Sequence, residues 1–219
     1  MNVEFPEADL ILPIWGEVRI PRPLCQIYFL PVIQRLSEIK QLALTDSKYS
    51  GGNHTRLEHS LGVLSVTEKI LDNLGRSGSL KPVDTTIIKL GALLHDIGHG
   101  GWGHSLDGLH GYVLSLLRRT NPDAEIPSAD KLDIAIAWYL LKENDQLRAG
   151  LRKIAEELGI EITELENAVS LMIAEEPGLI EHVRDDLRQA VLYGQTILGE
   201  PRGVGGVNAD RILLNSKFN

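Results

Sequence analysis

The sequence is poor in cysteine and has no long hydrophobic run. Its one cysteine, Cys25, has no partner for an internal disulfide, which fits a reducing compartment. The longest apolar stretch, LDIAIAWYLL at 132–141, contains Asp133 and is about half of the roughly 20 residues that cross a bilayer. The N-terminal segment MNVEFPEADL is acidic and lacks the basic start of a signal peptide. These features predict a cytoplasmic protein with no membrane partner.

Positive charge is also scarce, since 22 Lys and Arg residues face 30 Asp and Glu residues and the formal net charge is −8. Binding to polymeric nucleic acid depends on many basic contacts to phosphates, so such a partner is not expected. A small anionic substrate needs only a local cluster of cations, and a bound metal ion can supply much of that charge. The composition leaves a nucleotide or another small phosphoester as the candidate partner, with a second copy of the chain as a further one.

Internal repeats, low-complexity tracts and strong strand signals after residue 32 are lacking as well. Residues 1–31 alternate loosely between prolines, which predicts short extended segments or a hairpin. From Val32 onward the apolar residues recur at helical spacing. The chain is therefore predicted to be a single all-α domain, residues 1–219, whose helical region 120–205 carries no recognisable motif.

Apolar spacing and capping residues place the expected helices. They cover about 32–42, 57–74, 84–94, 106–119, 129–143, 145–158, 163–175 and 179–198, with a last short helix from about 208. Asp84 is the expected N-cap of its helix, and Thr163 and Glu166 have the spacing of a capping box. Residues 199–208 are expected to form a glycine-rich loop.

Histidine, by contrast, is concentrated: six of the seven histidines lie within residues 54–110. His95 and Asp96 are adjacent at the expected end of a helix, where both side chains can reach one ion that sits between them. An imidazole nitrogen and a carboxylate oxygen suit a divalent transition metal such as Mn, Fe, Co, Ni or Zn. His59, on the preceding helix, is the best third ligand. Asp210, which follows the glycine-rich loop, is the candidate fourth ligand.

Five segments in a fixed order carry a family resemblance. They are LPIWG at 12–16, QRLSEIKQLAL at 34–44, HTRLEHSLGV at 54–63, LLHDIGHGGWGH at 93–104 and NADRILLNSKF at 208–218. The segments and their order resemble those of the HD-domain metal-dependent phosphohydrolases, above all the branch of the deoxynucleoside triphosphate triphosphohydrolases. The resemblance implies an all-α HD fold and a metal-dependent phosphohydrolase site.

The resemblance also implies roles for individual residues. The metal ligands would be His59, His95, Asp96 and Asp210. The substrate contacts would be Arg56 and Arg211 to phosphate and Gln41 to the sugar. The catalytic residues would be His99, His104, Asp107 and His110. In these roles Asp107 would hold His104 in one tautomer, and a second ion such as Mg could bind through the substrate phosphates.

Departures from the family pattern leave more than one function open. The family's His-Glu pair corresponds here to His110-Gly111, Leu214 replaces a sugar-facing tyrosine, and Phe218 replaces an aspartate that contacts a sugar hydroxyl. The first hypothesis is hydrolysis of a deoxynucleoside triphosphate to nucleoside and triphosphate. One alternative is a nucleoside monophosphate phosphatase or another small phosphoester hydrolase of the superfamily. The other is a metal-bound regulatory or interaction module with little turnover.

Overall fold

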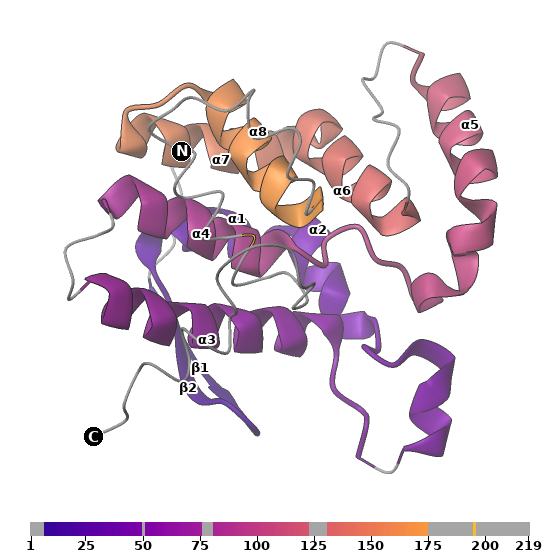
Figure 1. Cartoon of the computed structure of the whole chain (residues 1–219), viewed down its shortest axis with the longest axis horizontal. Coiled ribbons are helices and arrows are strands. Elements are labelled where there is room, and N and C mark those ends of the chain that lie inside the picture. The colour runs from indigo at the N-terminus through magenta and orange to yellow at the C-terminus, as the bar shows by residue number, and fades with distance from the viewer. Residues whose placement is uncertain (1–6, 50, 76–80, 123–130, 175–194, 196–219) are drawn as a thin grey trace, which may run out of the picture.

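The fold begins with a β-hairpin in the computed structural model, which describes residues 7–49, 51–75, 81–122, 131–174 and Gln195 (Figure 1). Strands β1 (Ala8–Leu12) and β2 (Gly16–Ile20) pair antiparallel, with Ala8 opposite Ile20. Gly16 ends the turn with φ of +70°, a conformation that glycine adopts without strain. The predicted N-terminal hairpin is thus confirmed, but the extended structure expected up to residue 31 is wrong from Arg22 onward, where the chain turns helical.

Four short helical elements follow the hairpin. They are α1 (Arg22–Tyr28), α2 (Pro31–Gln34) and the 3₁₀ helices η1 (Arg35–Glu38) and η2 (Ala43–Lys48). Both α1 and α2 begin with a proline in or next to the first turn, where the missing N–H costs no hydrogen bond.

The single helix expected over 32–42 is wrong, because the chain becomes extended at Ile39 (φ −107°, ψ 116°). The carbonyl of Ile39 accepts a hydrogen bond from the Arg56 N–H at 2.8 Å, and the Gln41 N–H donates to the carbonyl of His54 at 3.1 Å. This pairing with a distant segment replaces the hydrogen bonds that a longer helix would make. It also draws the QRLSEIKQ segment against the start of the next helix.

Two long helices carry the histidine motifs. Helix α3 (Arg56–Gly75) and helix α4 (Pro82–Leu94) lie side by side (Figure 1). The N-cap of α4 is Lys81, so the prediction that Asp84 caps this helix is wrong by three positions. Asp84 lies inside the first turn and accepts a hydrogen bond from the Lys81 N–H at 2.9 Å. The carboxylate still stabilises the helix start, but from within the helix.

The second half of the described chain is helical too. It contains the 3₁₀ helix η3 (Gly103–Leu109), α5 (His110–Thr120), α6 (Leu132–Glu143), α7 (Asp145–Leu158) and α8 (Ile162–Ala174). The expected helices at 129–143, 145–158 and 163–175 are therefore confirmed to within a few residues. The one expected at 106–119 begins as a 3₁₀ helix instead. Of the predicted helix at 179–198 only Gln195 is described, and the loop at 199–208 and the last helix lie outside the described residues.

The capping box predicted from Thr163 and Glu166 is wrong. The helix begins one residue earlier, and the Glu161 N–H donates to the carboxylate of Glu164 at 3.2 Å. Glu166 is buried and pairs with Arg148 of α7 at 2.9 Å. Tertiary packing between α7 and α8 therefore uses the carboxylate that the local pattern assigned to a cap.

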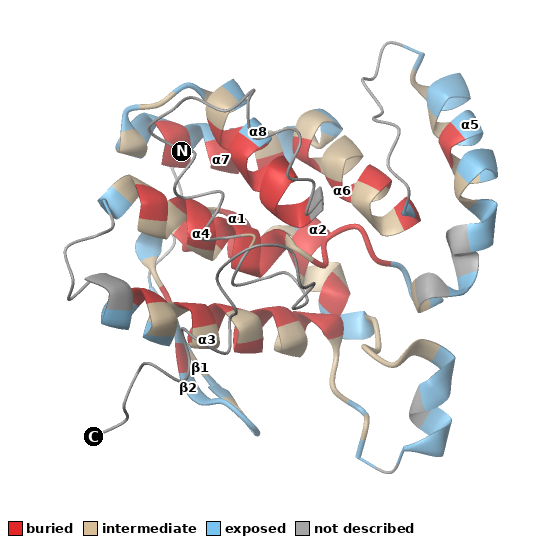
Figure 2. Cartoon of the chain, in the orientation of Figure 1, coloured by how far each residue is buried: buried red, intermediate tan, exposed pale blue. Residues whose placement is uncertain are grey.

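Helix α4 lies at the centre of the core, between α3 on one side and α8 on the other (Figure 2). Almost every residue from its second turn onward is buried, including Ile87, Ile88, Leu90 and Leu93. Helices α6, α7 and α8 pack over this layer, and α1 contacts α7 and α4. No helix among the described residues is long and apolar enough to cross a membrane. The mainly helical architecture agrees with the predicted fold class, and it fixes the end of α4 firmly in the interior.

Candidate metal centre

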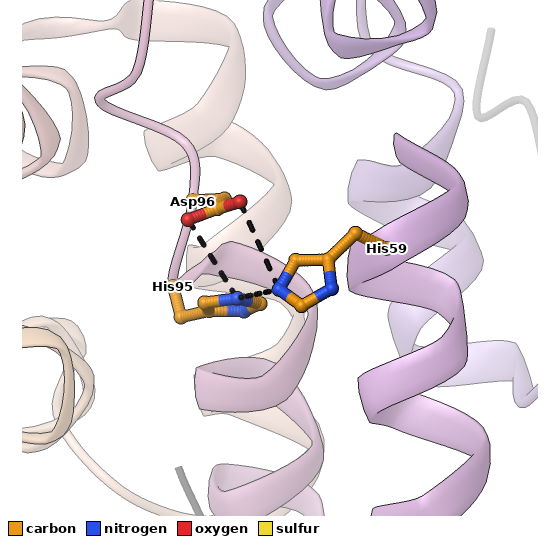
Figure 3. Close-up of side chains that lie close together, drawn as sticks. All are labelled: His59, His95 and Asp96. Atoms are coloured by element: carbon orange, nitrogen blue, oxygen red, sulfur yellow. Dashed lines mark hydrogen bonds and ion pairs between the residues drawn. The ribbon is translucent and has the colours of Figure 1, made fainter. Parts of the chain in front are cut away.

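Three of the predicted metal ligands, His59, His95 and Asp96, lie together where α3 passes the end of α4 (Figure 3). His59 is in the first turn of α3, and His95 directly follows Leu94, the last residue of α4. The Nε2 atoms of His59 and His95 are 3.2 Å apart. The carboxylate oxygens of Asp96 lie 3.7 Å from Nε2 of His95 and 4.0 Å from Nε2 of His59. Two nitrogens and a carboxylate are therefore directed at one point.

The hydrogen bonding of His95 fits metal binding. Its Nδ1 lies 2.9 Å from the carbonyl oxygen of Ala92, and because a carbonyl can only accept, Nδ1 carries the hydrogen. Nε2 is then left with a lone pair directed at His59 and Asp96. Metal-bound histidines commonly donate the N–H of their other ring nitrogen to a backbone carbonyl or a carboxylate. Two imidazoles and one carboxylate directed at a common point form a ligand set that suits a divalent transition metal. These residues therefore fit a divalent ion.

The local charges favour the protonation states that bind a metal. Burial lowers the pKa of His59, and the neighbouring His95 lowers it further, against a smaller opposing effect of Asp96. Burial alone would raise the pKa of Asp96, but the combined charges of His95, His99, Arg56 and His59 outweigh it and lower that pKa. A neutral imidazole and an ionised carboxylate are the forms that coordinate a metal ion.

Four further site predictions are not addressed by the described side chains. Asp210, the expected fourth ligand, and Arg211, the expected second phosphate contact, lie outside the described residues. His104 and Asp107 fall within η3, but their side chains are not described. Their roles remain predictions from the sequence.

Arg56, the expected phosphate contact, binds one of the predicted metal ligands directly. Its Nη1 donates to Oδ2 of Asp96 at 2.9 Å, and the residue is only 3% exposed. Gly103 covers it from the side of η3, since a Cβ at that glycine would lie 3.8 Å from Nη2 of Arg56. The guanidinium therefore holds one oxygen of the Asp96 carboxylate and leaves the other directed at His95 and His99.

His99 is buried and lies between two carboxylates. Its Nε2 is 3.4 Å from Oδ1 of Asp96 and 3.2 Å from Oδ2 of Asp133 in the first turn of α6. The close approach of α6 depends on Gly98, because a Cβ there would overlap the carbonyl oxygen of Asp133. The second carboxylate beside His99 thus comes from α6.

Sequence reasoning missed Asp133 as a site residue. The only signal is a carboxylate in an otherwise apolar helical stretch, LDIAIAWYLL, and that signal is equally typical of an acidic first turn. Its Oδ1 is buried and has no hydrogen-bond partner in the part of the chain that the structure describes. A cleft opens beside it, lined mainly by backbone and apolar side chains of Gly98, Gly100, Trp102, Leu132 and Ile136. Asp133 and His99 are the polar side chains of this cleft, so a substrate group that enters it would meet them.

The two other predicted contacts are near the ends of their elements. Gln41 is held beside the start of α3 by the hydrogen bond from its N–H to the carbonyl of His54, and its Oε1 is buried with no partner within the described ranges. His110 begins α5, and its Nε2 is also buried with no hydrogen-bond partner among the residues described. Among the described residues, neither side chain has a recorded contact with the metal ligands, and their roles stay predictions.

The region that carries this site matches a known protein family. A sequence model of the HD domain family matches residues 56–182, a range that begins at Arg56 and contains His59, His95 and Asp96. The chain belongs to the HD domain family, as its motifs predict. Members of this family are metal-dependent hydrolases.

Several curated relatives match part of the chain. The uncharacterized protein MG461 of Mycoplasma genitalium is 30% identical over 152 residues, which are 62% of this chain and 36% of the relative. The uncharacterized protein MJ1154 of Methanocaldococcus jannaschii is 42% identical over 51% of this chain and 28% of its own length. Human SAMHD1, a deoxynucleoside triphosphate triphosphohydrolase, is 34% identical over 44% of this chain and 16% of its own length. The chain thus matches between 16% and 36% of the length of these relatives.

Proposed function

We propose that this protein hydrolyses a phosphoester bond in a nucleotide, with a deoxynucleoside triphosphate as the best candidate substrate and nucleoside and triphosphate as products. The observation that carries the proposal is the group of predicted metal ligands, His59, His95 and Asp96, with His99 directly beside Asp96. The motif resemblance and the similarity to human SAMHD1 support the specific substrate. A divalent ion, when bound, would polarise a phosphoryl oxygen and make a bound water more acidic.

His59, His95 and Asp96 would hold this ion, with Asp210 as the proposed fourth ligand. Their arrangement does not depend on substrate, because Arg56 and the Ala92 carbonyl already fix Asp96 and His95. A site whose ligands are held by the surrounding protein loses little free energy to reorganisation when it binds its ion and substrate.

His99 would contact the substrate phosphate beside the metal ligands, and Asp133 would hold the imidazole of His99. The 3.2 Å contact keeps a proton on Nε2 and fixes the ring orientation, as carboxylates commonly do for functional histidines. His104, paired with Asp107, is the proposed proton donor to the leaving oxygen, and His110 is proposed to support the developing charge. Such proton transfer is typically worth about 10²–10⁴ in rate.

A smaller phosphoester is the second candidate, and the state of Arg56 favours it. A triphosphate carries several negative charges that need cations, yet this guanidinium is buried and committed to Asp96. Arg211 would have to supply the missing charge in the first hypothesis. A nucleoside monophosphate or a similar substrate needs the same ion and fewer basic contacts.

The deciding experiment is incubation with each nucleotide in the presence of Mn²⁺, Co²⁺, Ni²⁺, Zn²⁺ or Mg²⁺, followed by anion-exchange separation of the products. Tripolyphosphate with free nucleoside supports the triphosphohydrolase. Orthophosphate supports the second candidate. No product with any ion would contradict both hydrolases and favour a metal-bound regulatory or interaction module.

A further inference from the structure

Arg35, the first residue of η1, contacts the turn that follows the metal ligands. Its Nη1 donates to the carbonyl oxygen of His99 at 2.8 Å, and its Nη2 donates to the carbonyl oxygen of Ile97. One guanidinium therefore bridges two carbonyl groups that lie just beyond His95 and Asp96.

These carbonyls belong to the turn that directly follows α4. The C-terminal end of an α-helix carries partial negative charge, so a cation beside this turn is favoured. The N–H groups of this turn are satisfied locally. Those of Ile97 and His99 donate to the backbone carbonyl oxygens of Leu94 and Asp96, each at 3.0 Å. The Ile97 and His99 carbonyls accept hydrogen bonds from Arg35, so a side chain of η1 holds the turn that directly follows α4.

Arg35 is well fixed for this task. Its neighbours Ile33 and Leu36 are fully buried and anchor the backbone on both sides. The side chain is half-buried, and burial lowers its pKa from the usual value. Within the described chain it has no carboxylate partner among its recorded contacts, so carbonyl dipoles stabilise its charge. The planar guanidinium of arginine carries separate N–H donors that can reach two acceptors at once, whereas lysine has a single ammonium nitrogen.

We propose that Arg35 is a positioning residue of the metal centre. By holding the backbone at 97–99, it keeps Asp96 directed at His59 and His95 and keeps the His99 ring between Asp96 and Asp133. This inference rests on the metal centre of the proposed function but does not depend on which substrate is cleaved. Loss of such an outer contact typically costs 10–100-fold in metal affinity.

The first test measures the dissociation constant for Mn²⁺ in the full chain. Arg35→Met should weaken binding by about 10–100-fold, and Arg35→Lys, which keeps the charge but cannot bridge both carbonyls, should weaken it by about 10-fold. The matched control is Arg148→Met, because Arg148 is also a partly exposed arginine but pairs with Glu166, between α7 and α8. It should lower the melting temperature and leave the affinity unchanged. An Arg35→Met protein that is folded and binds Mn²⁺ within about threefold of the wild type would overturn the proposal.

The second test needs neither metal nor substrate, and it separates this inference from the proposed function. Amide hydrogen exchange of Ile97 and His99 in the metal-free protein should become at least about 10-fold faster in Arg35→Met, or in Arg35→Lys if the first variant does not fold. Amides in α7 and α8 should change no more than global stability requires. Equal acceleration throughout the core, or unchanged exchange at the turn, would contradict a positioning role even if hydrolysis is later found. Absent hydrolysis with selective acceleration would contradict only the proposed function.

Discussion

The turn at the end of α4 and the segment that follows it, residues 102–120 with η3 and α5, differ in how far their described side chains are buried. In the turn, Asp96 and His99 are each 6% exposed, and Arg35, Arg56 and Asp133 bind them or their backbone. In the following segment, the large apolar side chains Trp102, Leu109 and Tyr112 are 52–63% exposed, and Leu114 is the only residue of α5 that is buried.

This difference separates two requirements of a hydrolase. A metal ion needs ligands fixed within a few tenths of an ångström, and such ligands belong on buried, rigid elements. Groups that meet substrate must be reached from solvent, and segments with few core contacts have lower local stability. We therefore expect changes in the turn to affect metal binding and stability, and changes in η3 and α5 to affect turnover.

Replacing a metal ligand should have the largest effect. His95→Ala removes one of the three ligand atoms directed at the common point, so bound metal should be lost and hydrolysis should fall to the background rate. Elemental analysis and the anion-exchange assay measure both. His110→Ala should retain its metal. Asp210→Ala tests the fourth ligand, and an unchanged metal content in that variant would remove Asp210 from the set.

His104→Ala should show the opposite pattern, with metal retained and turnover reduced by about 10²–10⁴-fold. The reason is that a proton donor on η3 contributes to the reaction but not to ion binding. Metal content and kcat of the same preparation are compared. If His104→Ala loses its metal, His104 is a ligand and the distinction between the two regions fails.

Arg56→Met should destabilise the metal-free protein by about 3–5 kcal/mol, because it leaves the buried carboxylate of Asp96 without its partner. Urea unfolding gives the free energy. The double variant Arg56→Met/Asp96→Asn should be more stable than the sum of the two single changes predicts. Additive effects would show that the contact contributes little.

Asp133→Asn should lower turnover by about 10–100-fold and leave metal content unchanged, because the amide cannot hold His99 as the carboxylate does. The matched control is Asp145→Asn, a change at the first residue of α7. If KM rises by a larger factor than kcat falls, Asp133 binds substrate instead of orienting His99.

The smallest expected effect is a pH dependence of stability without metal. Because the pKa of His59 is lowered by burial, the unfolded chain binds its proton first as the pH falls below about 6.5, and stability is lost there. The lowered pKa of Asp96 adds a further loss at more acidic pH, below its ordinary value. Urea midpoints measured from pH 8 to pH 4 test the contribution of His59, and their extension to about pH 2 tests that of Asp96. His59→Gln should flatten the dependence between pH 5 and pH 7, and an unchanged curve would contradict the assigned cause.

Several features could be predicted from local sequence because local chemistry determines them. Helix α7 has the predicted bounds 145–158, since Asn144 caps its start and Gly159, at φ of +68°, ends it. The cluster of His59 with His95 and Asp96 was also predictable. Adjacent His and Asp at a helix end diverge by about 100° but can both reach one ion that sits between them. A preceding amphipathic helix can bring His59 beside them.

Other features could not be predicted, because their partners are far away along the chain. The helix expected over 32–42 is interrupted where Ile39 pairs with Arg56, and Glu166 pairs with Arg148 instead of capping its own helix. Neither partner lies within the few residues that a periodicity or a capping pattern covers.

The sequence by itself determined a mainly helical chain with a histidine- and aspartate-rich metal cluster, because residue type, spacing and charge are sufficient for both. Only the tertiary structure decided that Asp133 faces His99, that Arg56 holds Asp96 and that Arg35 holds the turn after α4. These contacts join residues 34 to 64 positions apart. Such contacts depend on how helices pack in three dimensions, and no local pattern records which side chains that packing brings together.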